Sequence, residues 1–142
     1  MAIQTTYSET MDQARAGAIA DMTDAILLSY TVEDEALPFG KPVVQGTADK
    51  GVHLATTGDT AILGISVRER STIDDEFAVA DTARIMTEGP IWVTAAVAVS
   101  AGDPVTVVVA TATFSNTGGV TIDNAIYETS AGIGELAKVR LA

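Results

Sequence analysis

Glycine and proline interrupt this chain at short intervals, and that spacing constrains the fold more than any other feature of the sequence. The 142 residues include 12 glycines and 4 prolines. Between them, apolar and polar residues alternate with a period of two, which is typical of strands with one buried face. The alternation is clearest over residues 91–99. One face of this expected strand carries Ile91, Val93, Ala95, Val97 and Val99, and the other carries Trp92, Thr94, Ala96 and Ala98. We therefore expect a mainly β protein.

The same alternation predicts a series of short strands separated by turn signals. Gly-Asp-Pro at 102–104 combines a residue that tolerates positive φ with one that fixes φ, and a hairpin is expected around 116–119. Short strands with frequent turns favour an antiparallel β-sandwich, a jelly roll or a small barrel. We expect strands over 26–32, 41–46, 52–56, 63–67, 82–87, 91–99, 105–112, 125–129 and 134–141.

Residues 1–24 do not share this rhythm and are expected to form an N-terminal arm. Ser8 could cap a short helix that carries Met11, Arg15 and Ile19, but Gly17 and the shifting apolar spacing weaken that pattern. An extended arm fits equally well. We therefore divide the chain into an arm over 1–24, extended or partly helical, and a single β-sandwich domain over 25–142.

Charge and composition limit the partners that such a chain can have. With 19 acidic and 8 basic residues the formal net charge is −11, the opposite of what phosphate backbones and anionic membranes attract. The N-terminus lacks the basic and apolar regions of a signal peptide, and the apolar stretches are too short to span a bilayer. We expect a soluble protein that binds neither nucleic acid nor membrane.

The inventory of reactive side chains predicts no enzyme, no metal site and no cofactor. Cysteine is absent, and the single histidine, His53, lies in an expected strand where a structural role is the commoner one. The acidic runs 33–35 and 74–76 lack calcium-loop spacing and are typical of solvated loops. Lys138 and Arg140 fall on the polar face of a strand, where they can be solvated or form inter-chain salt bridges. No catalytic residue is proposed.

The order of segments along almost the whole chain resembles the capsid cement (decoration) proteins of tailed bacteriophages. Each segment alone is a strand or turn pattern of low specificity, so the resemblance rests on their combination. The segments that carry it are, in chain order, 2–11, 18–22, 39–46, 91–93, 101–105, 124–129 and 132–141.

The resemblance implies a structural virion protein on the outer capsid surface, made in the cytoplasm of the host bacterium. Such a protein would bridge subunits of the major capsid protein, associate with itself as a homodimer or homotrimer, and stabilise the shell against internal DNA pressure. Tyr7, Met11, Arg15 and Ile19 are the expected contact residues of the arm, and Trp92 is expected in the core or at an oligomer interface.

Two alternatives remain open at this stage. One is a β-sandwich module that recognises glycans or a cell surface, although aromatic residues make up only 5% of the chain. The other is a small oligomeric enzyme with a site between chains, built on His53 and residues 74–76.

Overall fold

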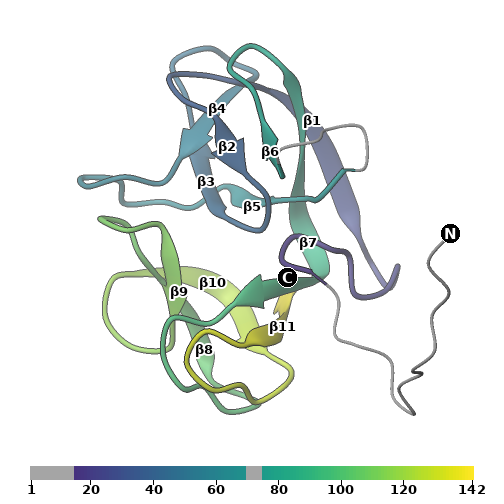
Figure 1. Ribbon diagram of the computed structural model, residues 1–142, viewed down its shortest axis with the longest axis vertical. Helices are drawn as coiled ribbons and strands as arrows, with labels where there is room; N and C mark the ends of the chain where they lie inside the picture. Colours follow the sequence, from purple (N-terminus) through teal and green to yellow (C-terminus); the bar gives the residue numbers. More distant parts are fainter. Residues whose placement is uncertain (1–14, 70–74) are drawn as a thin grey trace, which may run out of the picture.

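The structure is a computed structural model that describes residues 15–69 and 75–142, and these residues contain strands but no helix. The expected mainly β fold is confirmed (Figure 1). None of the described residues belongs to a helix long and apolar enough to cross a membrane. The strands are β1 (Ile26–Val32), β2 (Leu37–Pro38), β3 (Pro42–Gln45), β4 (Gly51–Leu54), β5 (Gly64–Ser66), β6 (Glu76–Phe77), β7 (Thr82–Thr94), β8 (Pro104–Val108), β9 (Thr113–Ser115), β10 (Val120–Tyr127) and β11 (Leu136–Leu141).

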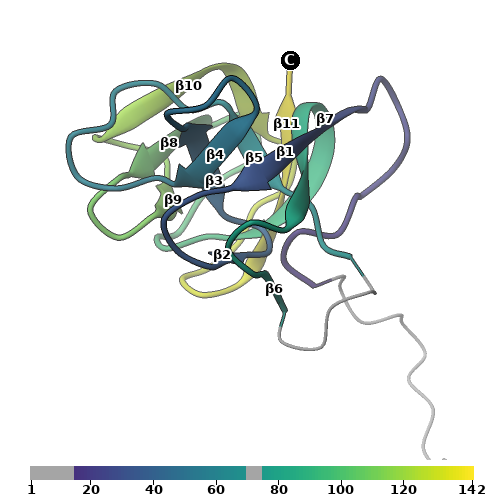
Figure 2. The ribbon, with the colours of Figure 1, turned by 90° about the horizontal axis from the view of Figure 1, so that it is seen from above.

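The first half of the long strand β7 belongs to a closed ring of strands that we call the N-terminal barrel. Hydrogen-bonded neighbours follow the order β1, β4, β3, β5 and β7, and β7 pairs back onto β1. All of these pairs are antiparallel except β1 with β4, which is parallel. The ribbon of β2 and β6 lies at one side of this barrel (Figure 2).

The second half of β7 belongs to a second ring, the C-terminal barrel. Its strands follow the order β7, β11, β10, β8 and β9, and a parallel bridge between Ala95 and Phe114 closes the ring. The amide of Ala96 donates to the Phe114 carbonyl at 2.9 Å across that closure. Of the architectures left open by the sequence, the small barrel describes both rings.

Each barrel has a buried apolar interior that the alternation of its strands creates. In β11, Ala137, Val139 and Leu141 are buried while Lys138 and Arg140 face outward, as the sequence predicts. The interior of the N-terminal barrel is formed by Tyr30, Val32, Leu37, Phe39, Val43, Val52, Phe77, Ala83 and Ile85.

The predicted strand break at Glu88-Gly89 is wrong, because β7 runs without interruption from Thr82 to Thr94. Gly89 pairs with Leu141 and Pro90 with Arg140, so both remain in the ladder with β11. Gly89 adopts a φ of 117°, and a Cβ at this position would lie 2.8 Å from the Cα of Ala25. The glycine therefore lets the chain pass from one barrel to the other with Ala25, the residue before β1, packed close against it.

The described part of the predicted arm, residues 15–24, is not helical. The helix considered for 8–23 is therefore absent from residues 15–23, and its remainder lies outside the described residues. The division of the chain at residue 24 stays a prediction.

Candidate interaction site

Residues 17–20 run along the edge of β7 that β11 leaves open and form an isolated β-bridge with it. The amide of Gly17 donates to the Trp92 carbonyl at 2.8 Å, the amide of Trp92 donates to Ala18 at 3.0 Å, and the amide of Ala20 donates to Pro90 at 3.1 Å. Ile19 and Ile91 form an antiparallel bridge at the centre of this contact. We call this ladder between residues 17–20 and β7 the arm seam.

Two glycines in close contact fix one end of the arm seam. A Cβ on Gly17 would lie 2.7 Å from the Gly40 nitrogen, and a Cβ on Gly40 would lie 2.6 Å from the Gly17 nitrogen. Both have positive φ, 84° and 69°. Arg68 completes the corner, since its amide donates to the Gly17 carbonyl at 2.8 Å and its Nε donates to the Ala16 carbonyl at 3.1 Å. Only glycine fits at both places without moving the backbone.

Four charged side chains hold the other end of the seam, and we call them the charge cluster: Asp21, Glu128, Lys138 and Arg140. The Lys138 ammonium lies 3.2 Å from Asp21 Oδ2 and 3.1 Å from Glu128 Oε2. Arg140 Nε donates to Glu128 Oε1. The cation pair noted in the sequence thus forms salt bridges within the chain, and one of them reaches the arm.

The charge cluster shifts the pKa values of its members toward their charged forms. Hydrogen bonding from Arg140 is the main cause that lowers the pKa of Glu128, with Lys138 adding to it. The pKa of Asp21 is lowered first by the backbone amide of Thr23 and then by Lys138. The hydrogen bond to Glu128 raises the pKa of Lys138. All members therefore stay ionised across the neutral range.

Three of the five predicted contact residues lie at or beside this seam. Ile19 is half-buried and packs against the core of the C-terminal barrel, Trp92 is half-buried and bonds the arm through its backbone, and Arg15 is exposed. Tyr7 and Met11 lie outside the described residues. The structure thus brings Ile19 and Trp92 together, and their contacts with a partner stay a prediction.

Sequence reasoning missed the residues that fix the arm to the body. Gly40 and Arg68 come from different loops, and nothing in their local sequence indicates that they meet Gly17. Asp21 follows an apolar stretch within 18–22 and carries no pairing signal. The one sequence feature that points to these contacts is the placement of Lys138 and Arg140 on the polar face of one strand, which makes both available for salt bridges.

The residues considered for chemistry have structural contacts instead. His53 Nδ1 lies 2.9 Å from the Leu54 carbonyl. Asp75 forms a 2.5 Å ion pair with Arg68, and Asp74 lies outside the described residues. Within 15–69 and 75–142, no group of three or more His, Asp or Glu residues is placed to hold a metal ion.

The acidic run 33–35 is only partly the solvated loop that the sequence suggests. The carboxylate of Glu33 accepts the amide of Thr47 at 2.8 Å and the amide of Ala48 at 3.2 Å, so it fastens the turn between β3 and β4. The backbone amide of Thr47 is the main cause that lowers the pKa of Glu33. Asp34 and Glu35 are exposed, as expected.

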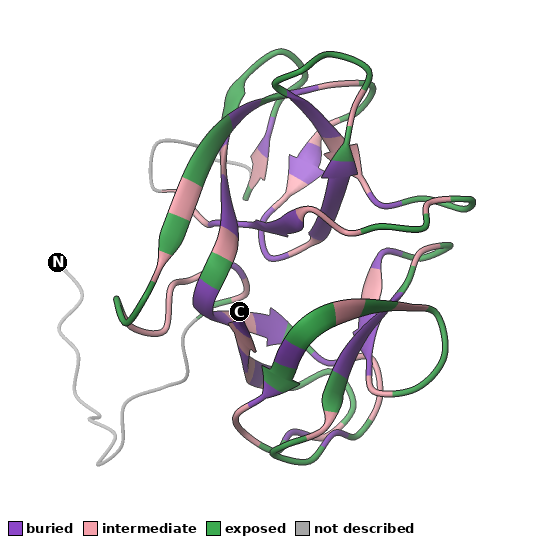
Figure 3. Cartoon of the chain, turned by 180° about the vertical axis from the view of Figure 1, so that it is seen from behind, coloured by how far each residue is buried: buried purple, intermediate pink, exposed green. Residues whose placement is uncertain are grey.

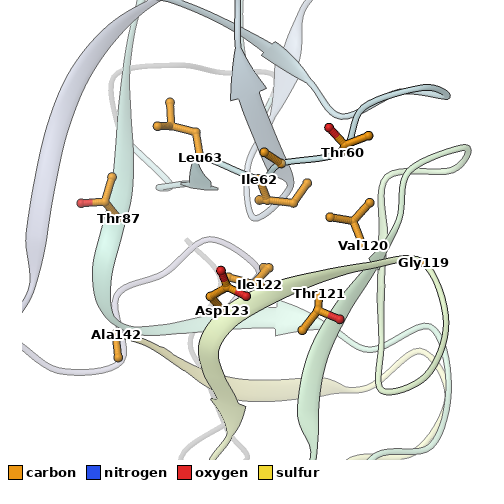
Figure 4. A pocket seen from close by; sticks show the side chains of 11 residues that line it. Thr60, Ile62, Leu63, Thr87, Gly119, Val120, Thr121, Ile122, Asp123 and Ala142 are labelled. Atoms are coloured by element: carbon orange, nitrogen blue, oxygen red, sulfur yellow. The ribbon is translucent and has the colours of Figure 1, made fainter.

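A cleft of about 550 Å³ separates the two barrels on one side of β7 (Figure 4). Its walls are the chain before β5 and the start of β10, with Thr87 of β7 and Ala142 between them. The lining that the described residues supply is Thr60, Ala61, Ile62, Leu63, Thr87, Gly119, Val120, Thr121, Ile122, Asp123 and Ala142. Asp123 supplies the one side-chain carboxylate of this lining, and none of the lining residues is aromatic.

Solved structures share this fold. A chain from the capsid of Myoviridae phage XM1 matches with a TM-score of 0.78 at 16% identity, covering 99% of this chain and 98% of that one. The head fiber gp8.5 N base of bacteriophage phi29 matches with a TM-score of 0.56 at 11% identity, covering 83% of this chain and 94% of that one. At these identities the likeness shows the fold alone. No curated protein matches the chain in sequence.

Comparison with models of protein families shows which family the chain matches. Residues 3–142 match a phage cement family described as structural cement protein (E217 gp24/Pam3 gp6). The match covers nearly the whole chain, both barrels and the arm seam included. The chain therefore belongs to this family of phage structural cement proteins and is a structural protein of the virion.

Proposed function

We propose that this protein binds the outer surface of a tailed-phage capsid, bridges subunits of the major capsid protein and stabilises the shell against internal DNA pressure. The observation that carries the proposal is the arm seam. A protein that links subunits must transmit load from its extension to its body, and the seam joins the two through backbone hydrogen bonds, a two-glycine contact and an ion pair.

The seam suits the transfer of force because its contacts are spread over two strands, β7 and β11. Residues 17–20 bond β7, which is shared by both barrels, while Asp21 bonds Lys138 of β11. A pull on residue 15 is therefore distributed over the body before it reaches β1. Residues 1–14 would be the segment that contacts the neighbouring capsid subunits, with Tyr7 and Met11 as its apolar anchors.

The charge of the chain supports an external position. A net charge of −11 opposes contact with packaged DNA, whose phosphates carry the same sign. On the outer surface the same charge favours solubility of the finished particle. Synthesis in the host cytoplasm follows from this assignment.

The test is binding to expanded capsids that lack the protein. The seam predicts that a chain without residues 1–14 keeps its circular dichroism spectrum and melting temperature but loses capsid affinity by at least about tenfold. A matched control replaces residues 1–14 by a glycine–serine segment of equal length, which keeps the length and removes the side chains. Undiminished binding of both variants would overturn the role of the arm.

A second measurement tests stabilisation itself. Capsids saturated with the intact protein should withstand heating or osmotic shock better than bare capsids, and the truncated chain should give no protection. If bound protein leaves the rupture of filled capsids unchanged, the cementing function is wrong even where binding is observed.

A further inference from the structure

The first half of β1 has a hydrogen-bonded neighbour on one of its two edges only. β1 pairs with β7 from Ile26 to Thr31, but with β4 only at Thr31 and Val32. Among the described residues, no other strand pairs with β1. The edge of residues 26–30 that faces away from β7 is therefore unpaired, and we call it the open edge. Figure 3 shows β1 at the outer margin of the N-terminal barrel, with most of its residues exposed.

The backbone groups of Leu27 and Ser29 point toward the open edge. On the β4 side of the strand, the amide of Glu33 donates to β4 at 2.8 Å, and the amide of Thr31 donates to the residue before β4 at 2.7 Å. Successive residues of a strand direct their amides and carbonyls to opposite edges, so Leu27 and Ser29 share the direction of Thr31. Nothing in the described part of the chain bonds to their two amides and two carbonyls.

The open edge lacks the charges and prolines that usually protect an exposed strand. Residues 26–32 read Ile-Leu-Leu-Ser-Tyr-Thr-Val, with no charged residue and no proline among them. Ile26 and Leu28 keep 44% and 39% of their surface exposed. An apolar edge with unpaired backbone groups is a template for a further strand. The edge therefore favours pairing with a partner over exposure to solvent.

We propose that the open edge binds an extended segment of the major capsid protein, which adds to β1 as a further strand. The inference deepens the proposed function, on which it rests, by naming a second contact surface and the chemistry of its partner. A bridge between subunits needs two attachment points. The arm would supply one of them, and the open edge supplies the other on the body of the protein.

Two carboxylates lie at the start of the open edge. Glu88 of β7 pairs with Ile26, and Asp24 lines the same surface hollow as both of them. Neither carboxylate forms a salt bridge within the described part of the chain. Arg140, the cation that lines this hollow, is already paired with Glu128. The capsid segment should therefore carry a lysine or arginine where it covers this end of the edge.

The need for a cation favours the capsid segment over two other occupants. A second copy has a net charge of −11, and its Lys50, beside the far end of the edge, already lies 4.9 Å over the Tyr30 ring of its own chain. Residues 1–14 of the same chain include Glu9 and Asp12 but no lysine or arginine. A segment of another protein can supply the cation, and membership of a cement family makes the capsid its source.

Hydrogen exchange tests the added strand at the amides themselves. The unmodified full chain is compared free in solution and bound to expanded capsids that lack it. The amides of Leu27 and Ser29 should exchange at least about tenfold more slowly on the capsid, whereas those of Leu28 and Tyr30, which face β7, should change little. A bound chain with unprotected Leu27 and Ser29 amides would overturn the inference and leave the cementing function standing. Failure of the unmodified chain to bind at all would overturn the proposed function itself.

Two variants of the edge test its contribution to affinity. Ser29→Pro removes an outward amide without removing a bond to β7, so it should keep the circular dichroism spectrum and weaken capsid binding by at least about tenfold. Leu28→Lys places a charge on the edge and should weaken binding similarly, also where the proline variant does not fold. Val108→Lys is the matched control, because Val108 is 37% exposed at the end of β8 and its change should leave affinity intact. Equal affinities of the Leu28 and Val108 variants would contradict the proposal.

Further measurements test the identity and charge of the occupant. Sedimentation velocity of the free protein should give the same mass for Ser29→Pro as for the unmodified chain; dissociation of an oligomer by this change would make a second copy the occupant. Glu88→Gln should weaken capsid binding more at low than at high ionic strength, whereas Glu35→Gln, at an exposed carboxylate elsewhere, should not. Equal binding of these two variants would overturn the assignment of a cationic segment.

Discussion

The two barrels share one strand but hold their interiors together in different ways. The buried cluster of the N-terminal barrel contains only residues of that half, with Phe39 and Phe77 packed edge to face at 5.0 Å. The cluster of the C-terminal barrel extends beyond its own strands and takes in a group from the other half: Val44, Ala55, Ile65, Val67 and Met86. The contact between the barrels is therefore part of the C-terminal core, and the arm seam is attached to that same core through Ile19.

The largest effects should come from removing one buried ring from each core. Phe77→Ala and Phe114→Ala each delete a side chain that is 1% exposed, which costs about 3–5 kcal/mol of the free energy of unfolding. Hydrogen exchange should then separate the two regions. Phe114→Ala should weaken protection in both barrels and in the arm seam, whereas Phe77→Ala should act mainly on β1, β3 and β4.

The comparison would be wrong if the two variants lost protection over the same strands. An equal loss of protection from both variants would mean that β7 couples the two barrels tightly. It would then make no difference to stability that the contact between them is part of the C-terminal core. Chemical denaturation gives the total loss, and exchange gives its distribution.

The next largest effect concerns the contact between Gly17 and Gly40, which ties the arm to the N-terminal barrel. Gly40→Ala places a Cβ 2.6 Å from the Gly17 nitrogen at a φ of 69°, so both crowding and backbone strain oppose it. We expect a loss of about 1–3 kcal/mol and faster exchange of the arm-seam amides.

Gly102→Ala is the matched control for that change. Gly102 also has a positive φ, 94°, but a Cβ there meets nothing within 4 Å. It should therefore show the cost of the strained backbone alone, about 1 kcal/mol, without any effect on the arm. Equal losses for the two variants would mean that the glycine contact adds nothing to the seam.

What could be predicted from the sequence differs between these regions for a physical reason. Alternation determines which side of a strand is buried, so the pattern of Val139 against Lys138 and Arg140 and the mainly β class could be predicted correctly. The contact of Gly17 with Gly40 could not, because it depends on how distant loops meet. The continuity of β7 was also missed, since Gly89 and Pro90 normally mark a strand end and are tolerated here at the passage between barrels.

The residues of the candidate site also divide into those that the sequence predicts and those that it does not. The sequence predicts Ile19 and Trp92 as interaction residues, and the structure places both at the arm seam of one chain. Asp21 and Glu128 are not predicted, because the sequence around a single charged residue gives no indication of its partner. Which residues touch the capsid protein is a property of the partner as well, and it stays a prediction.

A smaller effect should come from the buried hydroxyl of the C-terminal barrel. Tyr127 donates a hydrogen bond from its hydroxyl to the Ser115 carbonyl at 2.9 Å, so Tyr127→Phe should cost about 1 kcal/mol by removing that buried hydrogen bond. Tyr30→Phe in the N-terminal barrel is the control, because the Tyr30 ring lies beneath the Lys50 ammonium, 4.9 Å away, and phenylalanine keeps that ring.

Alkaline titration sharpens the same comparison. Burial, with Asp103 adding to it, raises the pKa of Tyr127 from 10 to about 12. The unfolded chain therefore loses this proton first, and stability should fall as the pH rises from 10 toward 12. Tyr127→Phe should flatten that decline. A decline that persists unchanged in Tyr127→Phe would assign the alkaline loss to other groups.

The smallest effect should come from the charge cluster, and its size tells whether charge or backbone holds the arm. Glu128→Gln removes the carboxylate shared by Lys138 and Arg140, at a cost of about 0.5–1 kcal/mol near pH 7.

The contribution of Glu128 to stability should depend on pH. Because the pKa of Glu128 is lowered in the folded state, this contribution is present above its ordinary pKa of 4.5 and is lost as the pH falls through the folded value. The variant and the intact chain should therefore converge in acid. Glu35→Gln, at an exposed carboxylate of the other barrel, is the control for the loss near pH 7. If Glu128→Gln also released the arm-seam amides to exchange, the ion pairs would be the main attachment. Retained protection assigns that role to the β7 ladder and the two glycines, which salt cannot screen.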